Sequence, residues 1–115
     1  MLGCKSMFFT SLQQAIEFPP EWTVKGVILT SKSEAGSKYD VVSRYFAPFL
    51  GILEDPVTGS AHCALAPYWC EQLGRKDFLG FQASSRGGLI GVELNGDRVF
   101  LSGEAVVVLK GKMKF

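Results

Sequence analysis

The segment Gly51–Gly74, GILEDPVTGSAHCALAPYWCEQLG, decides the fold of this chain. It opens with an acidic turn, Glu54-Asp55-Pro56, and continues through small residues into an apolar run that ends at Leu73. This order predicts a loop that leads into a helix from about Gly59 to Leu73. A helix with apolar residues at nearly every position is typically enclosed on most sides by the rest of the fold.

The two ends of this helix carry the residues that helix ends prefer. Thr58 is the predicted N-cap, because its hydroxyl can accept a hydrogen bond from an amide of the first turn. Gly74 is the predicted C′ residue, where glycine adopts the left-handed conformation at little cost. Pro67 lies inside the helix, where a proline predicts a kink or a break.

The start of the helix is a candidate anion site. Its free amides and the positive end of its dipole attract negative charge, and Gly59 allows close approach to the backbone. The carboxylate of Asp55 lies just before this site in the sequence. A carboxylate beside an anion site suggests proton transfer to or from a substrate that is itself anionic.

Composition narrows the class of protein. The chain has 115 residues, 47% hydrophobic, with a formal charge of +1. No basic stripe is present, so neither nucleic acid nor a membrane surface is an expected partner. No signal peptide or segment of membrane-spanning length is seen, and we expect a cytoplasmic protein.

The cysteines and the histidine indicate no cofactor. Cys63 and Cys70 fall on the predicted helix and are expected to behave as small hydrophobic residues in a reducing compartment. His62 is the sole histidine, and no Cys/His cluster with zinc-ligand spacing accompanies it. We therefore expect no metal and no organic cofactor.

The remaining sequence predicts one short helix and several strands. A capping box at Ser11 predicts a helix over 12–18, and Asn95-Gly96 predicts a type I′ hairpin. Ser31–Lys38 is predicted to be an exposed turn. The predicted strands are 24–30, 39–46, 78–84, 89–94, 98–102 and 104–109. The expected architecture is one α+β domain over residues 1–115, a β-roll or barrel-like sheet wrapped around one central helix.

Three motifs together resemble the phenazine-biosynthesis PhzF-like family of the diaminopimelate epimerase superfamily. They are RYFAP at 44–48, GILEDPVTGSAH at 51–62, and QASSRGG at 82–88, followed by the hairpin GVELNGDRV at 91–99. The resemblance runs from about Val24 to Phe115. It implies a protein of two similar halves, each a barrel-like sheet around one helix, with the site in the cleft between them.

The resemblance also implies roles for individual residues. A glutamate from the N-terminal half acts with the aspartate and serine of the DPxTGS motif, which are Asp55 and Ser60 here. The glutamate has no counterpart, so the chain looks like the C-terminal half alone, a fragment of a two-domain protein. From their own chemistry, the candidate substrate-binding residues are Thr58, Gly59 and Ala61 at the helix start, together with Arg86, whose planar guanidinium suits a carboxylate.

The implied reaction is cofactor-free proton abstraction and return on a small carboxylate substrate, an epimerisation or a double-bond shift. The expected partners are a small anionic substrate and either the missing N-terminal half or a second copy of the chain. The alternative is a non-catalytic half-protein that acts as an interaction module.

Several residues keep an ordinary structural explanation beside the functional one. Ser60 either bonds substrate or simply occupies the first helical turn, and Arg86 is equally well an exposed loop residue. Arg44 is expected to pair with Glu54 or Asp55, and His62 to be a core histidine with its hydrogen bonds satisfied.

Overall fold

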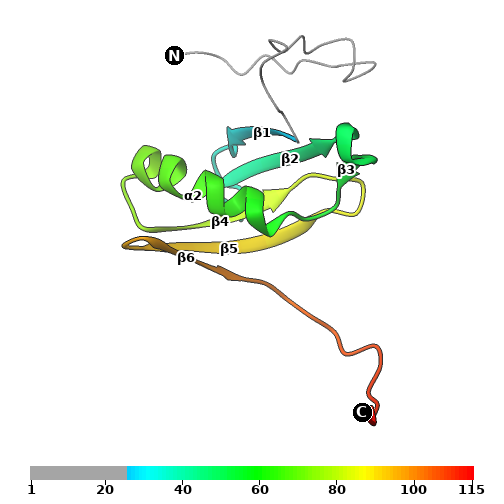
Figure 1. Cartoon of the computed structure of the whole chain (residues 1–115). Helices are drawn as coiled ribbons and strands as arrows, with labels where there is room; N and C mark the ends of the chain where they lie inside the picture. Colours follow the sequence, from blue (N-terminus) through cyan, green and yellow to red (C-terminus); the bar gives the residue numbers. More distant parts are fainter. Residues whose placement is uncertain (1–25) are drawn as a thin grey trace.

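The computed structural model describes residues 26–115, in which six strands form one sheet and a helix packs against it (Figure 1). The predicted α+β class is confirmed. The strands are β1 (Val27–Lys32), β2 (Val41–Ala47), β3 (Ile52–Asp55), β4 (Asp77–Gln82), β5 (Gly88–Asn95) and β6 (Arg98–Ser102). The helix is α2 (Gly59–Leu73), and a 3-10 turn, η1 (Pro48–Leu50), precedes β3. The helix predicted over 12–18 lies outside the described residues.

The sheet is mixed, with strand order β1-β2-β4-β5-β6 and with β3 paired to β2. All pairs are antiparallel except β2 with β4, where Val41 lies opposite Gly80 and Ser43 opposite Gln82. A parallel pair needs a crossover connection, and α2 supplies it between β3 and β4. The topology therefore brings the end of β3, the start of α2 and the end of β4 together.

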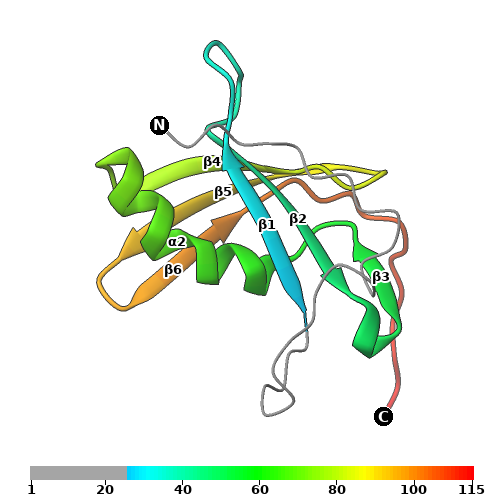
Figure 2. The same ribbon diagram turned by 90° about the horizontal axis from the view of Figure 1, so that it is seen from above.

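The core lies between one face of α2 and the sheet (Figure 2). Along β4 the buried residues alternate, so that Phe78, Gly80 and Gln82 face the helix. From α2, Leu65 and Trp69 pack into the same core. The Trp69 indole also donates a hydrogen bond of 2.9 Å to Thr30 Oγ1. The full hydrophobic cluster consists of Val41, Leu65, Ala66, Trp69, Cys70, Phe78, Ile90 and Val92.

The other face of α2 is exposed, which corrects the expectation of an enclosed helix. Cys63, Ala64, Pro67 and Tyr68 all lie on this exposed face, and Tyr68 is 52% exposed. Within the described residues, the sheet therefore covers only one side of α2 and does not wrap around it. The apolar sequence predicted enclosure wrongly, because alanine, cysteine and proline occur on the solvent-facing side of a helix as well as in a core.

The bounds of α2 agree with the prediction, and Gly74 has the left-handed φ of 67° expected after the last turn. Pro67 does not break the helix, which runs unbroken over 15 residues. Since Pro67 lies on the exposed face, water can satisfy the Cys63 carbonyl that loses its amide partner.

Three further predictions are corrected. Glu54 and Asp55 do not form a turn but end strand β3, where Asp55 pairs with Tyr45. The hairpin turn is Gly96-Asp97, one residue later than predicted, because Asn95 pairs with Arg98. Only Gly96 has a positive φ there, which is the pattern of a type II′ turn rather than type I′.

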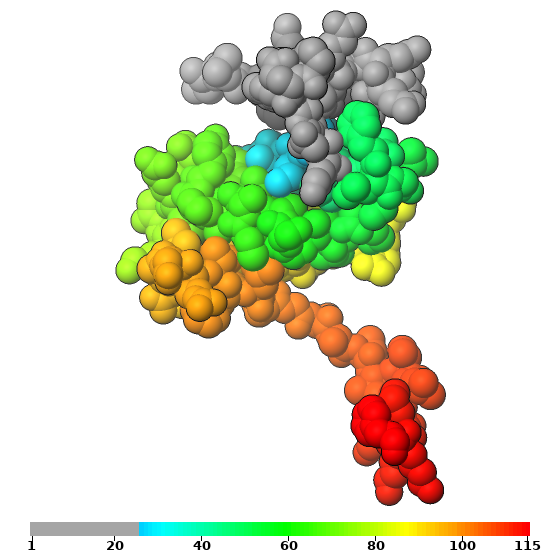
Figure 3. All heavy atoms as spheres, in the orientation of Figure 1, coloured from blue at the N-terminus to red at the C-terminus, as the bar shows by residue number. Residues whose placement is uncertain are grey.

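The segment 104–109 is not a strand. It continues from β6 as an exposed tail that leaves the body of the molecule (Figure 3), and Val108 is 94% exposed. A strand needs a neighbour for its backbone amides and carbonyls, and no strand of residues 26–115 lies beside this segment. No helix of the described part is long and apolar enough to cross a membrane.

Candidate functional site

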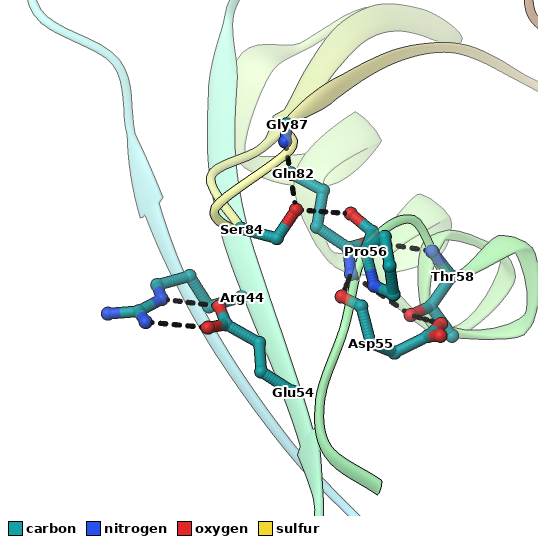
Figure 4. A network of polar contacts seen from close by, with 8 residues as sticks. All are labelled: Arg44, Glu54, Asp55, Pro56, Thr58, Gln82, Ser84 and Gly87. Carbon is teal, nitrogen blue, oxygen red and sulfur yellow. Dashed lines mark hydrogen bonds and ion pairs between the residues drawn. The ribbon is translucent and has the colours of Figure 1, made fainter.

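The candidate site lies where β3 ends and α2 begins, as the polar network of Figure 4 shows. Asp55 is the last residue of β3, and Pro56-Val57-Thr58 form the loop to the helix. The side chain of Asp55 is half-buried, while Thr58 is buried. The carboxylate of Asp55 therefore lies at the N-terminal end of α2, as the sequence predicted.

Gln82 holds this loop from the end of β4. Its Oε1 accepts a hydrogen bond of 2.7 Å from the Thr58 amide, and its Nε2 donates to the Asp55 carbonyl at 2.7 Å. Nε2 also lies 3.0 Å from Thr58 Oγ1. The Gln82 side chain is fully buried, and its three hydrogen bonds within the described residues all go to this loop.

Thr58 occupies the N-cap position, but its hydroxyl does not cap the helix. No hydrogen bond joins this hydroxyl to an amide of the first turn; instead it donates to Asp55 Oδ2. The first hydrogen bond of the helix runs from the His62 amide to the Thr58 carbonyl. The amides of Gly59, Ser60 and Ala61 precede it and have no partner within the helix, which leaves them available to an anion.

A second loop supports the site from the other side. Ser84 Oγ donates to the Pro56 carbonyl at 2.7 Å and accepts from the Gly87 amide at 3.0 Å. Arg86 belongs to this loop and is exposed. It lines an open groove of about 820 Å³ together with Val57. The described residues show no hydrogen bond or ion pair between Arg86 and Asp55.

The other predicted site residues lie on the first turn of α2. Ser60 is exposed and makes no side-chain hydrogen bond within the described part of the chain. Ala61 is buried, so only its backbone could meet a ligand. Gly59 is half-buried, and a Cβ there would lie 3.4 Å from Leu101. The structure thus brings Asp55 together with the helix start but leaves Arg86 on the neighbouring loop.

Arg44 forms the structural ion pair that was expected, with Glu54. Its Nε and Nη2 donate to the two carboxylate oxygens of Glu54 at 2.7 and 2.8 Å. This bidentate hydrogen bonding to Glu54 raises the pKa of Arg44 above its ordinary value, although burial opposes the rise. Glu54 is thereby engaged, and Asp55 is the carboxylate that faces the helix start.

His62 is a core histidine, as expected. It is 1% exposed, its Nδ1 donates to the Thr58 carbonyl at 2.8 Å, and its ring packs against Gly80. Within residues 26–115, no group of three or more His, Cys, Asp or Glu side chains is placed to hold a metal ion.

Gln82 is the residue of this polar network that the sequence interpretation missed as a candidate site residue. A signal was present: Phe78, Gly80 and Gln82 occupy the inward positions of one strand, and only the last is polar. A polar side chain at an inward position must find buried partners, which indicates a loop or site at that end of the strand.

Comparison with known proteins identifies the family. The profile of the family described as "Phenazine biosynthesis-like protein" matches residues 10–111. A protein from Halalkalibacterium halodurans, named an uncharacterized isomerase, is 54% identical over 89 residues, which cover 77% of this chain and 33% of the relative. The human phenazine biosynthesis-like domain-containing protein is 52% identical over 94 residues, or 78% of this chain and 33% of the relative.

A solved structure gives the same result. The crystal structure of a PhzF family protein from Enterococcus faecalis matches with a TM-score of 0.67 and 42% identity, over 79% of this chain and 34% of that one. The chain spans about a third of the length of the curated relatives it matches. By profile, sequence and structure, this chain belongs to the phenazine biosynthesis-like protein family.

Proposed function

We propose that this chain is the C-terminal part of a cofactor-independent isomerase that removes and returns a proton on a small carboxylate substrate. The observation that carries the proposal is the position of Asp55. Its carboxylate lies at the positive end of α2, and only one of its two oxygens is engaged by Thr58. The names of relatives as isomerases support the same class of reaction.

In this proposal Asp55 is the acid/base group and the start of α2 binds the substrate carboxylate. The amides of Gly59, Ser60 and Ala61 supply hydrogen-bond donors beside a positive dipole end. An anion held there has its acidic carbon next to a carboxylate that can accept a proton. The hydroxyl of Ser60, on the first turn of α2, and the guanidinium of Arg86, on the neighbouring loop, are further groups that would bind the substrate.

The second acid/base group is proposed to come from protein outside this chain. A proton that leaves one position and returns at another normally needs two groups on opposite sides of the substrate, and Asp55 is one. The glutamate that the family resemblance implies would be the other, supplied by an N-terminal half that also closes the cleft against water. We place the assembled protein in the cytoplasm, and we propose that further strands close the sheet around the open face of α2.

The test is deuterium incorporation by the reassembled protein. The 115-residue chain is mixed with the part of the Halalkalibacterium halodurans relative that precedes the matching third. This mixture is incubated in deuterated water with a panel of small α-amino acids and unsaturated carboxylates. Incorporation should require both parts and should fall by about 10²–10⁴-fold in Asp55→Asn.

The matched control is Asp97→Asn, the same chemical change in the exposed turn between β5 and β6. It should retain full exchange. Exchange by the unmixed chain that Asp55→Asn abolishes would contradict the need for a second half. Exchange by the mixture that survives Asp55→Asn would remove Asp55 from the acid/base role.

The alternative function is a non-catalytic interaction module. The observation in its favour is the amount of apolar surface left open, notably Tyr68 on α2 and the Val106–Val108 run of the tail. If the mixed parts bind each other with no exchange on any substrate of the panel, the interaction module becomes the better description.

A further inference from the structure

Gln82 presents a buried polar side chain that the proposed acid/base chemistry does not itself require. It ends β4, where it lies opposite Ser43 of β2 and Gly88 of β5, and it is 0% exposed. Burying a glutamine costs side-chain entropy and leaves three hydrogen-bonding groups to satisfy. Within residues 26–115, all hydrogen-bond partners of its side chain belong to two residues, Asp55 and Thr58.

The orientation of the Gln82 amide is fixed by its backbone partners. The Thr58 amide can only donate, so the atom 2.7 Å from it must be Oε1. The Asp55 carbonyl can only accept, so the atom 2.7 Å from it must be Nε2. A reversed amide would place two donors together at one end and two acceptors at the other.

This orientation in turn directs the hydroxyl of Thr58. Because Gln82 Nε2 donates to Thr58 Oγ1 at 3.0 Å, the hydroxyl accepts there and keeps a single hydrogen to donate. That hydrogen goes to Asp55 Oδ2. Within the described residues Oδ1 of Asp55 receives no hydrogen bond. The two oxygens of the carboxylate are therefore made unequal, one bound to protein and one open.

We propose that Gln82 is a positioning residue, which acts through the Thr58 hydroxyl to hold the Asp55 carboxylate in one rotamer with Oδ1 open to substrate. The catalytic meaning of this arrangement rests on the proposed function, but the arrangement itself is a property of the chain. Residues that hold a catalytic group in one geometry lower the cost of reaching the transition state.

The experiment measures the rotamer of Asp55 in the 115-residue chain by NMR, through the three-bond couplings from its Cγ to its own amide nitrogen and carbonyl carbon. Thr58→Val removes the hydroxyl but keeps the shape of the side chain and the amide that Gln82 binds. Thr58→Ser keeps the hydroxyl. We expect the couplings of one staggered rotamer in the unmodified chain and in Thr58→Ser, and averaged couplings in Thr58→Val and Gln82→Met.

The matched control is Ser84→Ala. It removes another anchor of the same loop, the 2.7 Å hydrogen bond to the Pro56 carbonyl, without touching the side chain of Asp55. We expect its couplings to match those of the unmodified chain. Amide spectra establish whether each variant is folded. If Gln82→Met does not fold, Thr58→Val still tests the hydroxyl through which Gln82 is proposed to hold Asp55.

In the complemented protein, Thr58→Val should lower kcat for deuterium exchange by about 10²-fold with KM unchanged, and Thr58→Ser should restore it. A single Asp55 rotamer in Thr58→Val or in folded Gln82→Met, or averaging in Ser84→Ala as strong as in Thr58→Val, would overturn the positioning role. Absence of exchange in the unmodified complex would count against the proposed function alone, because the coupling measurement decides the positioning role independently.

Discussion

At the residue scale, two separate groups of polar side chains hold neighbouring segments to strand β4. Around Asp55, Gln82 and Thr58 join the end of β3 to the end of β4. In the first half of β4, the Leu79 amide donates a hydrogen bond of 2.8 Å to Asp40, which also pairs with Arg75. The first group shapes the candidate site, whereas the second fastens the turn before β2 to the sheet.

Asp40 should make the stability of the domain sensitive to acid. Burial acts to raise the pKa of Asp40, but the Leu79 amide and the Arg75 guanidinium outweigh it and lower the pKa below its ordinary value of 3.8. The ionised carboxylate therefore stabilises the fold above about pH 3.8, and this contribution is lost as the pH falls through the lower folded-state pKa.

Asp40→Asn should accordingly lower the free energy of unfolding by about 1 kcal/mol at pH 7, a modest value because the side chain is partly open to solvent. The loss should shrink toward zero in the most acidic buffers in which the chain stays folded. Urea unfolding across this pH range measures both, with Asp97→Asn as a control that should stay within about 0.5 kcal/mol. A penalty that grows as the pH falls would contradict the assigned direction.

Sequence alone located the acid/base candidate but not its support. The EDPVTGSAH motif singled out Asp55 because of its family resemblance and its place before a helix. The sequence predicts that the Thr58 hydroxyl caps the first turn of α2, yet this hydroxyl donates to Asp55 Oδ2. That choice depends on Gln82, which comes from a strand 24 residues away in sequence, and no local rule contains such a partner.

At the element scale, α2 was predictable because its ends are local. Thr58 and Gly74 mark its boundaries by their own conformational preferences, and both boundaries are correct. The surroundings of a helix, in contrast, depend on residues far from it in the sequence. The apolar composition of α2 was compatible with enclosure, but its buried residues recur in pairs three and four apart, leaving Cys63 and Pro67 outside.

The two helical cysteines should report this one-sided packing. Cys63 is exposed, while Cys70 is buried in the core and burial raises its pKa, with a smaller contribution from Asp77. Since the thiolate is the reactive form, iodoacetamide should modify Cys63 readily and Cys70 only after denaturation. Peptide mapping by mass spectrometry distinguishes the sites. Equal protection of both would indicate a helix enclosed on all sides, and equal reactivity would indicate that the core is not formed.

The strands also differ in whether local sequence was enough to predict them. Those with a partner adjacent in sequence, such as β5 and β6 around Gly96, were found with small errors in their turns. β3 was missed because its four residues include two acidic ones, and only pairing with β2 makes them a strand. The segment 104–109 has strong β propensity but no neighbour in the described part of the chain, and propensity alone does not create a strand.

At the scale of the whole molecule, residues 26–115 combine a packed sheet with an exposed apolar tail. The tail carries Val106, Val107, Val108 and Leu109 in succession, each at least 84% exposed. β6, from which the tail continues, forms one edge of the sheet. Exposed apolar runs and free sheet edges both favour association between copies.

We therefore expect the purified chain to self-associate as its concentration rises, and we expect the tail to be the main cause. Val106→Lys combined with Val108→Lys places two charges on one side of the extended tail and should shift the sedimentation profile toward monomer. The fold should be unaffected, because neither residue belongs to the core. Sedimentation velocity over a range of concentrations, with circular dichroism as the check on folding, measures both effects.

The matched control adds the same two charges at exposed polar positions elsewhere, Gln72→Lys with Ser85→Lys. If this control dissociates the chain as well as the tail variant does, general charge repulsion explains the result and the tail has no special part. If neither variant changes the profile, the tail is not the main contact, and the free edge of β6 and the open face of α2 around Tyr68 are the remaining surfaces. Addition of the N-terminal part of a relative should then compete with self-association, because the same apolar surface would be covered in either complex.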